Sequence, residues 1–143
     1  MSRRGRRSRG QALVEFTLVA PLFFLLLFAI IDFGRYVYYV QVINNAAREG
    51  ARYAIVHGSE GIPSTGPPDD PSGAAVKAVV RNHLIGVIGN GTDITITPTW
   101  PDGQNTRDST VTVTVTYQFR SLIPLVPLPA ITVEGGSTLV INT

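Results

Sequence analysis

The sequence predicts an α+β fold: a long N-terminal transmembrane helix continues into a small domain with one short helix and a three- to four-stranded antiparallel sheet. Three observations predict this. A run without ionisable groups covers Phe16–Ile31. No proline occurs between Leu22 and Ile62, so a helix can continue to about Val56. From Ile94 onward, apolar and polar residues alternate as in strands.

Composition and charge exclude several kinds of site and partner. The 143 residues fit one folded unit with a leader or anchor, and the absence of cysteine excludes disulfides, thiolate metal sites and cysteine nucleophiles. Five basic residues lie in the first nine positions: Arg3, Arg4, Arg6, Arg7 and Arg9. The rest of the chain carries seven basic and ten acidic residues, a net charge of −3. No nucleic-acid partner is therefore expected, because the positive charge is a short leader and not a face of the fold.

The apolar run is long enough to cross a membrane when its flanks are included. Phe16–Ile31 spans about 24 Å as a helix, and the flanks extend it to the roughly 30 Å of a bilayer core. The basic leader, against Arg35 alone just after the run, places the N-terminus in the cytoplasm. A removable signal and a plain signal anchor are the alternatives. The first lacks a small-residue cleavage site soon after the run, and the second does not explain Glu15, a carboxylate inside the apolar stretch.

Several short motifs lie in and around this helix. They are Gly10 after the basic leader, Glu15 five residues later, Phe16 directly after it, and the segments APLF, DFGR and NNAAREGARYA that begin at Ala20, Asp32 and Asn44. Together, over about Arg6 to Ala54, they resemble the N-terminal region of TadE-like proteins, the minor pilins or pseudopilins of Tad pili.

This resemblance implies a processing and assembly route. A prepilin peptidase would cleave between Gly10 and Gln11, and the mature chain would join other pilin subunits through the Tad assembly platform in the membrane. Glu15, followed by Phe16, would set the register by neutralising the free amine of a neighbouring subunit, which offsets the cost of burying either charge. A carboxylate that only reaches the cytoplasmic headgroups is the alternative for Glu15.

Two further features lie on the helix. Asp32 and Arg35 are spaced to pair across one turn, either as a structural ion pair at the membrane interface or as a contact to the assembly platform. A stripe of small residues follows, consisting of Ala47, Gly50, Ala51 and Ala54. Such a stripe permits close approach of another backbone, which is either the chain's own domain or a neighbouring subunit.

The exported part is expected to begin with an irregular loop rich in Gly and Pro. Asp69 and Asp70 are interpreted as a helix cap and not as metal ligands, and the short helix after them would end at the glycines Gly86 and Gly89. Its expected apolar face consists of Ala75, Val76, Val79, Val80 and Ile85. Asn90-Gly91 is expected to turn into the first strand. The clearest strand is Thr110–Phe119, and the segment after it is expected to pair as two pieces, Ile131–Val133 and Thr138–Ile141.

The chain is accordingly divided into five parts. These are a basic prepilin leader (1–10), a transmembrane helix (11–35), its extracytoplasmic extension (36–56), a loop rich in Gly and Pro (57–73) and a small α+β globular part (74–143). The chain shows no catalytic, phosphate-binding or metal-binding pattern, and no cofactor is expected.

The predicted function is that of a structural subunit of a Tad-type pilus, with a role in cell adhesion and no enzymatic activity. The expected location is the bacterial cytoplasmic membrane, crossed once, with the C-terminus outside. The chain then either stays in the membrane as a pseudopilin or is incorporated into the extracellular pilus as a minor pilin. The alternative is a signal-anchored extracytoplasmic binding protein unrelated to pili.

Overall fold

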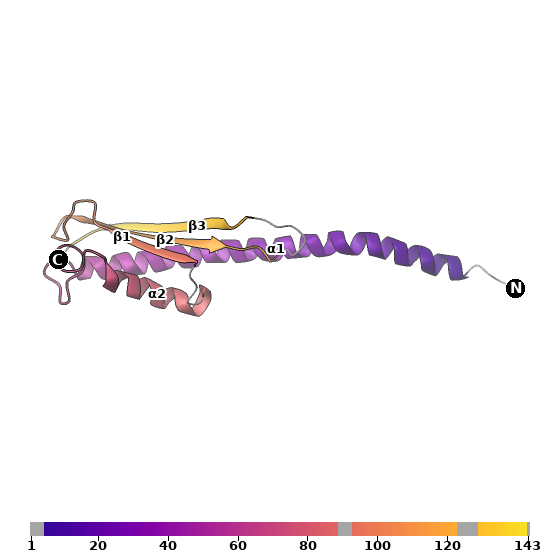
Figure 1. Cartoon of the computed structure of the whole chain (residues 1–143), viewed down its shortest axis with the longest axis horizontal. Helices are drawn as coiled ribbons and strands as arrows, with labels where there is room; N and C mark the ends of the chain where they lie inside the picture. Colours follow the sequence, from indigo (N-terminus) through magenta and orange to yellow (C-terminus); the bar gives the residue numbers. More distant parts are fainter. Residues whose placement is uncertain (1–4, 89–92, 123–128, 143) are drawn as a thin grey trace.

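The computed structural model describes residues 5–88, 93–122 and 129–142 and shows a long helix with a small domain packed along its C-terminal half (Figure 1). The elements in chain order are α1 (Gly5–Val56), α2 (Ala74–Ile88), β1 (Ile94–Thr99), β2 (Thr110–Phe119) and β3 (Ile131–Val140). The strands form one antiparallel sheet in the order β1-β2-β3. The predicted α+β class is confirmed, with three strands among the described residues.

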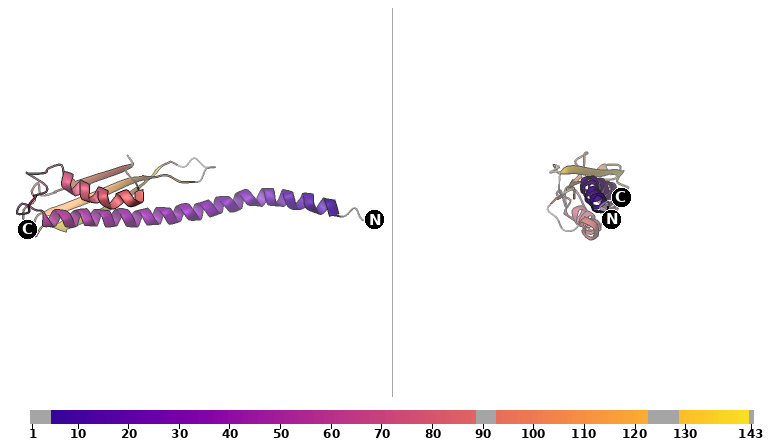
Figure 2. Two further views of the ribbon diagram at one scale, coloured as in Figure 1. Left: turned by 90° about the horizontal axis from the view of Figure 1, so that it is seen from below. Right: turned by 90° about the vertical axis from the view of Figure 1, so that its right-hand side faces the viewer.

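Helix α1 is a single rod of 52 residues, about 78 Å long. It begins at Gly5 and not at Gln11, because the basic leader contains no proline and arginine is a good helix former. The helix also continues through Pro21, whose missing amide proton removes one backbone hydrogen bond. Figure 2 shows the rod curving gently along its length without a break.

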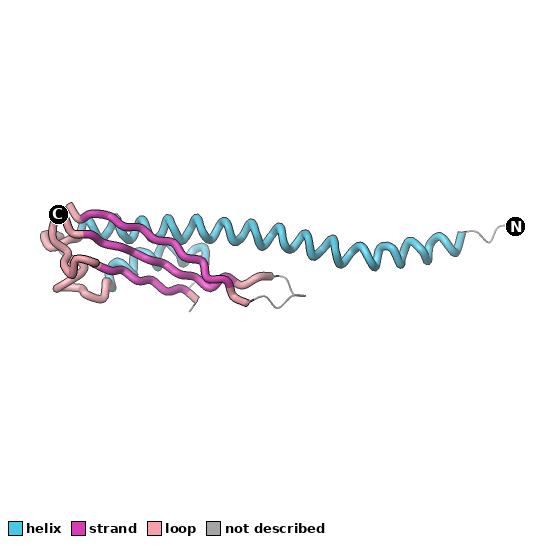
Figure 3. Tube along the Cα trace, turned by 90° about the horizontal axis from the view of Figure 1, so that it is seen from above, coloured by secondary structure: helices cyan, strands magenta, loops and turns pink. Residues whose placement is uncertain are grey.

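The sheet and α2 pack against the outer half of α1 from two sides (Figure 2). The strands run lengthwise along the helix (Figure 3). The inward face of β2 consists of Val111, Val113 and Val115, which are fully buried, while the threonines between them point outward. The alternation in the sequence therefore predicted both the strand and its buried face.

The small-residue stripe of α1 lies inside the chain's own core. Ala47, Ala51 and Ala54 are fully buried. A Cβ added at Gly50 would lie 2.4 Å from Cγ2 of Val80 in α2, so glycine is the residue that fits there. The sequence left two possible contacts for this stripe, and the structure shows the one with the chain's own domain.

Strand β3 differs from expectation, because it is one continuous strand through Glu134, Gly135 and Gly136 and not two pieces. The pair of glycines indicates a break in the sequence, but its first member faces α1. A Cβ at Gly135 would lie 2.8 Å from Cγ2 of Ile43 and 3.0 Å from the amide nitrogen of Asn44. The glycine thus lets the sheet approach the helix while the strand stays paired.

Helix α2 begins as expected and does not end at Gly86, the first of the two glycines expected at its end. The backbone amides of Ala74 and Ala75 donate to the carboxylate of Asp70 over 3.0 and 3.1 Å. Partial burial alone would raise the pKa of Asp70, but these hydrogen bonds outweigh it and hold the pKa below its ordinary value of 3.8. The helix then runs through Gly86, since nothing crowds that position. The expected end at Gly89 and the Asn90-Gly91 turn lie outside the described residues.

The buried face of α2 also needs correction. It consists of Val76, Val80 and Leu84, which are spaced four residues apart. Ile85, which was expected inward, is 42% exposed. One step of 100° around the helix separates Leu84 from Ile85, so the packing of α2 on α1 decides between two neighbouring apolar residues.

The segment 57–73 has no helix or strand, as predicted, but it is not merely a surface loop. It folds over Trp100 at the end of the domain far from the N-terminus, and Thr65 within it is fully buried. The side-chain amide of Asn105 donates to the carbonyl of Thr65 over 2.8 Å. The loop therefore closes the distal end of the core.

The two glycines of β3 provide a matched test of this packing. Gly135→Ala is expected to lower the free energy of unfolding by about 1–3 kcal/mol, because the added methyl group meets Ile43 and the backbone of α1. Gly136→Ala is expected to leave it unchanged or to raise it slightly, because its Cβ would meet only ordinary contacts at 3.7 and 4.0 Å. Thermal unfolding of the detergent-solubilised chain measures both. Equal losses for the two variants would contradict the close approach.

Candidate assembly interface

The N-terminal part of α1 is an apolar surface that the domain leaves uncovered. Every residue from Gly10 to Ile31 is exposed, apart from Ala20, which is partly exposed. Among the described residues, α1 is the one helix long and apolar enough to cross a membrane. An apolar surface of this extent is not stable in water, so lipid or other helices must cover it.

The residues expected at the processing site lie inside the helix. Gly10 and Gln11 are both helical and exposed. A Cβ added at Gly10 would meet no atom within 4 Å. Packing within the chain therefore does not require glycine here, although glycine costs about 1 kcal/mol relative to alanine inside a helix.

Glu15 and Phe16 begin the apolar surface and are both exposed. Among the side chains that the structure describes, none forms a hydrogen bond or an ion pair with Glu15. An unpaired carboxylate in the apolar part of a membrane costs a few kcal/mol. Glu15 is thus placed where a partner from outside the chain would stabilise it.

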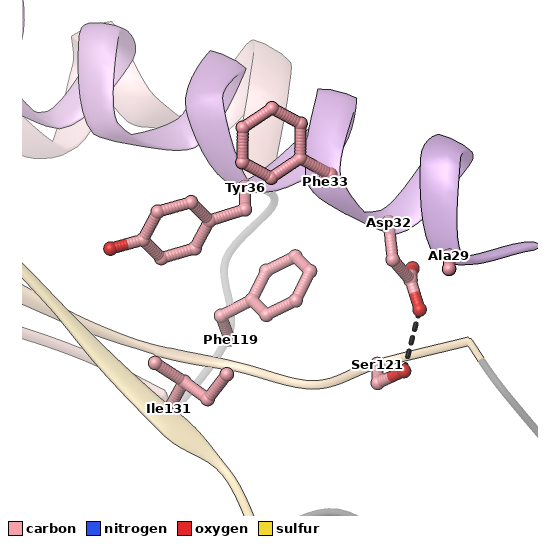
Figure 4. A pocket seen from close by; sticks show the side chains of 7 residues that line it. All are labelled: Ala29, Asp32, Phe33, Tyr36, Phe119, Ser121 and Ile131. Carbon is pink, nitrogen blue, oxygen red and sulfur yellow. Dashed lines mark hydrogen bonds between the residues drawn. The ribbon is translucent and has the colours of Figure 1, made fainter.

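Asp32 and Arg35 form an ion pair at 2.8 Å between Oδ1 and Nη1. The other carboxylate oxygen of Asp32 accepts hydrogen bonds from the hydroxyl of Ser121 at 2.5 Å (Figure 4) and from the amide of Leu122 at 2.8 Å. The guanidinium of Arg35 lies 5.2 Å from the ring centre of Phe119. These contacts, here called the Asp32 junction, attach the segment after β2 to α1 where the apolar run ends.

Sequence reasoning found Asp32 and Arg35 but missed their distant partners Ser121 and Leu122. The Asp32 carboxylate is only 7% exposed, and a buried carboxylate requires several donors. This need for several donors was the signal that further partners of Asp32 exist. It does not identify which segment supplies the donors, because Ser121 lies 89 residues further along the chain.

An open groove of about 390 Å³ lies beside the junction, between α1 and the end of the sheet. Its lining residues are Ala29, Asp32, Phe33, Tyr36, Phe119, Ser121 and Ile131. Figure 4 shows the aromatic side chains of α1 and β2 facing one another across it, with Ile131 on the β3 side. The groove is therefore mostly apolar, with the Asp32 carboxylate and the Ser121 hydroxyl at one end.

No cluster of three or more metal-ligating side chains occurs within 5–88, 93–122 and 129–142. The polar groups of the junction are engaged with one another. The described residues instead provide two apolar surfaces for binding. These are the uncovered part of α1 and the groove where that part meets the sheet.

The family model described as TadE-like protein matches residues 10–52. No curated protein and no solved structure matches the chain. The matched segment includes Gly10, Glu15, the apolar run and most of the small-residue stripe, so the resemblance stated from the sequence is confirmed over this part of the chain. The match covers less than a third of the 143 residues, and the domain that packs on α1 lies outside it.

The Asp32 junction is testable by amide exchange at Leu122. Asp32→Ala is expected to speed that exchange about tenfold or more, because hydrogen bonds to charged groups contribute roughly 1.5–3 kcal/mol. Hydrogen–deuterium exchange of the detergent-solubilised chain measures it. Asp93→Ala is the control, since it removes an exposed ion pair with Arg120 at 3.5 Å and is expected to leave Leu122 unaffected. Unchanged exchange in the Asp32 variant would contradict the junction.

Proposed function

We propose that the chain is a structural subunit of a Tad-type pilus, either a minor pilin or a pseudopilin, because residues 10–52 match the family model of TadE-like proteins. One observation supports this most. Within the matched segment, the apolar helix from Gly10 to Ile31 is left uncovered by the chain's own domain, as required of a helix that packs first in lipid and then among other subunits.

In this proposal the prepilin peptidase cleaves between Gly10 and Gln11. The bond lies within α1, so the helix must unwind locally before the backbone can enter a protease cleft in extended form. Glycine lowers the cost of that unwinding, and its missing side chain removes an obstruction at the cleft. The open space around Gly10 supports a role in processing, because the fold itself does not need a glycine there.

Glu15 then acts in assembly. After cleavage it is the fifth residue, and four residues of helix rise about 6 Å. Pairing of Glu15 with the free amine of a neighbouring subunit would offset the cost of both charges and would displace the two helices by about one turn. Phe16 and the apolar residues after it would supply the packing surface, but packing alone does not fix a register.

The proposed orientation follows from the charges. The basic leader stays in the cytoplasm, α1 crosses the bacterial cytoplasmic membrane once, and the domain lies outside. The proposed partners are the prepilin peptidase, the assembly platform, other pilin subunits and the lipid bilayer. A signal-anchored binding protein would share the anchor but would need neither cleavage after Gly10 nor a charge at Glu15.

Processing is measured by the intact mass of the chain from its native cells. The mass is expected to fall by residues Met1 through Gly10 when the peptidase is present and to remain complete when its gene is deleted. Gly10→Leu is expected to block the loss, because a side chain would obstruct the cleft. Gly5→Leu, the same change inside the leader, is expected to leave processing intact. A full-length chain in peptidase-containing cells would reject the pilus proposal.

Assembly is measured by the amount of chain in sheared pili relative to the membrane fraction. Glu15→Ala and Glu15→Gln are both expected to lose nearly all incorporation while the chain stays in the membrane, because the neighbouring amine then lacks its counter-charge. Glu60→Gln, at an exposed carboxylate of the distal loop, is the control and is expected to assemble normally. Normal incorporation of both Glu15 variants would refute the register role.

A further inference from the structure

We propose that the groove beside the Asp32 junction holds acyl chains of the outer leaflet, so that the near end of the sheet is seated in the surface of the bilayer. The inference rests on the proposed membrane-spanning role of α1. It assigns a second membrane contact to the chain, made by the domain and not by the helix alone.

The position of the groove is the first argument. About twenty helical residues are needed to cross the hydrocarbon core. Counted from Gln11 they end at Ile30, and counted from Phe16 they end at Arg35, so the outer limit of the core falls between these two residues. The helix wall of the groove lies between Ala29 and Tyr36. Because the strands run along α1 (Figure 3), the other wall, made by Phe119 and Ile131, lies at the same depth.

The chemistry of the walls is the second argument. Phe33 is 68% exposed and Ile131 is 46% exposed, and both line the groove. Ile30 and Ile31, which directly precede Asp32 on α1, are also exposed, so the lipid-facing surface of the helix reaches the edge of the groove. Its volume of about 390 Å³ lies within the range of pockets that hold small apolar ligands.

The polar end of the groove fits the same depth. Asp32 is only 7% exposed, and it accepts hydrogen bonds from Arg35, Ser121 and the Leu122 amide. A carboxylate next to hydrocarbon needs such internal donors, since lipid tails supply none. Tyr38, exposed on the next turn of α1, is a residue type enriched at headgroup level.

A spin label tests which medium fills the groove. The chain has no cysteine, so single cysteines can be introduced without other changes. Ile131→Cys and Val140→Cys lie at the two ends of β3 with nearly equal exposure, 46% and 48%. Leu22→Cys reports on the membrane-spanning part of α1. The full chain is reconstituted at low density in phosphatidylcholine and phosphatidylglycerol vesicles, and the collision of each label with oxygen and with a water-soluble nickel chelate is measured.

The labels are expected to differ in their access to oxygen and to nickel. The Leu22 label is reached by oxygen and not by nickel, the Val140 label is reached by nickel, and the Ile131 label resembles the Leu22 label at a shallower depth. Leu122→Cys, on the neighbouring exposed segment, is expected to behave like Ile131→Cys and covers the case in which the latter folds poorly.

Three results would overturn the inference. Nickel access at Ile131 equal to that at Val140, with Leu22 in lipid, would place the groove in water and leave the anchor intact. Protection from both reagents, with spin–spin broadening that disappears on dilution with unlabelled chain, would show a second copy in the groove. Nickel access at Leu22 would remove the anchor itself and the inference with it.

Discussion

The close approach of two backbones to the outer half of α1 is the constraint on which the rest of the structure depends. On the helix, Gly50 and its alanine neighbours leave room for α2 and β2, and on the sheet Gly135 leaves room for α1. Because valine side chains of α2 and β2 pack onto Gly50 and Ile43 packs onto Gly135, the domain has few alternative ways to sit on the helix. The direction of the domain relative to α1 is therefore fixed by packing and not by a linker.

The Asp32 junction supplies a second attachment at the opposite end of the sheet. After Asp32, α1 has one buried stripe and one polar face, and over the run 16–31 before it the helix is apolar and uncovered. The carboxylate marks this boundary and holds the segment after β2 against it through Ser121 and Leu122. An ion pair predicted from local spacing thus also has a tertiary role.

Local pattern predicted most of the fold. The length of α1, the alternation in β2 and the cap at Asp70 each depend on residues close in sequence, so a single chain is enough to find them. The errors have another origin. In the sequence, Gly135 indicates a break in the strand, and only its contact with α1 explains why the strand continues. Whether Leu84 or Ile85 is buried depends on the angle at which α2 packs on α1. At the site, Asp32 was visible, but its donors Ser121 and Leu122 were not, because no local rule links them.

For a helix that leaves lipid to join other helices, apolar packing gives little direction, because lipid tails are as apolar as leucine and phenylalanine side chains. The polar groups and the shape of the subunit must then determine its axial position and its rotation among its neighbours. In the proposed pilus, Glu15 would set the axial register at one end of the apolar segment, and the rigidly attached domain would limit rotation at the other. A lipid-filled groove at the base of the sheet would add a third constraint, since withdrawing the chain into a filament would require those lipids to be released.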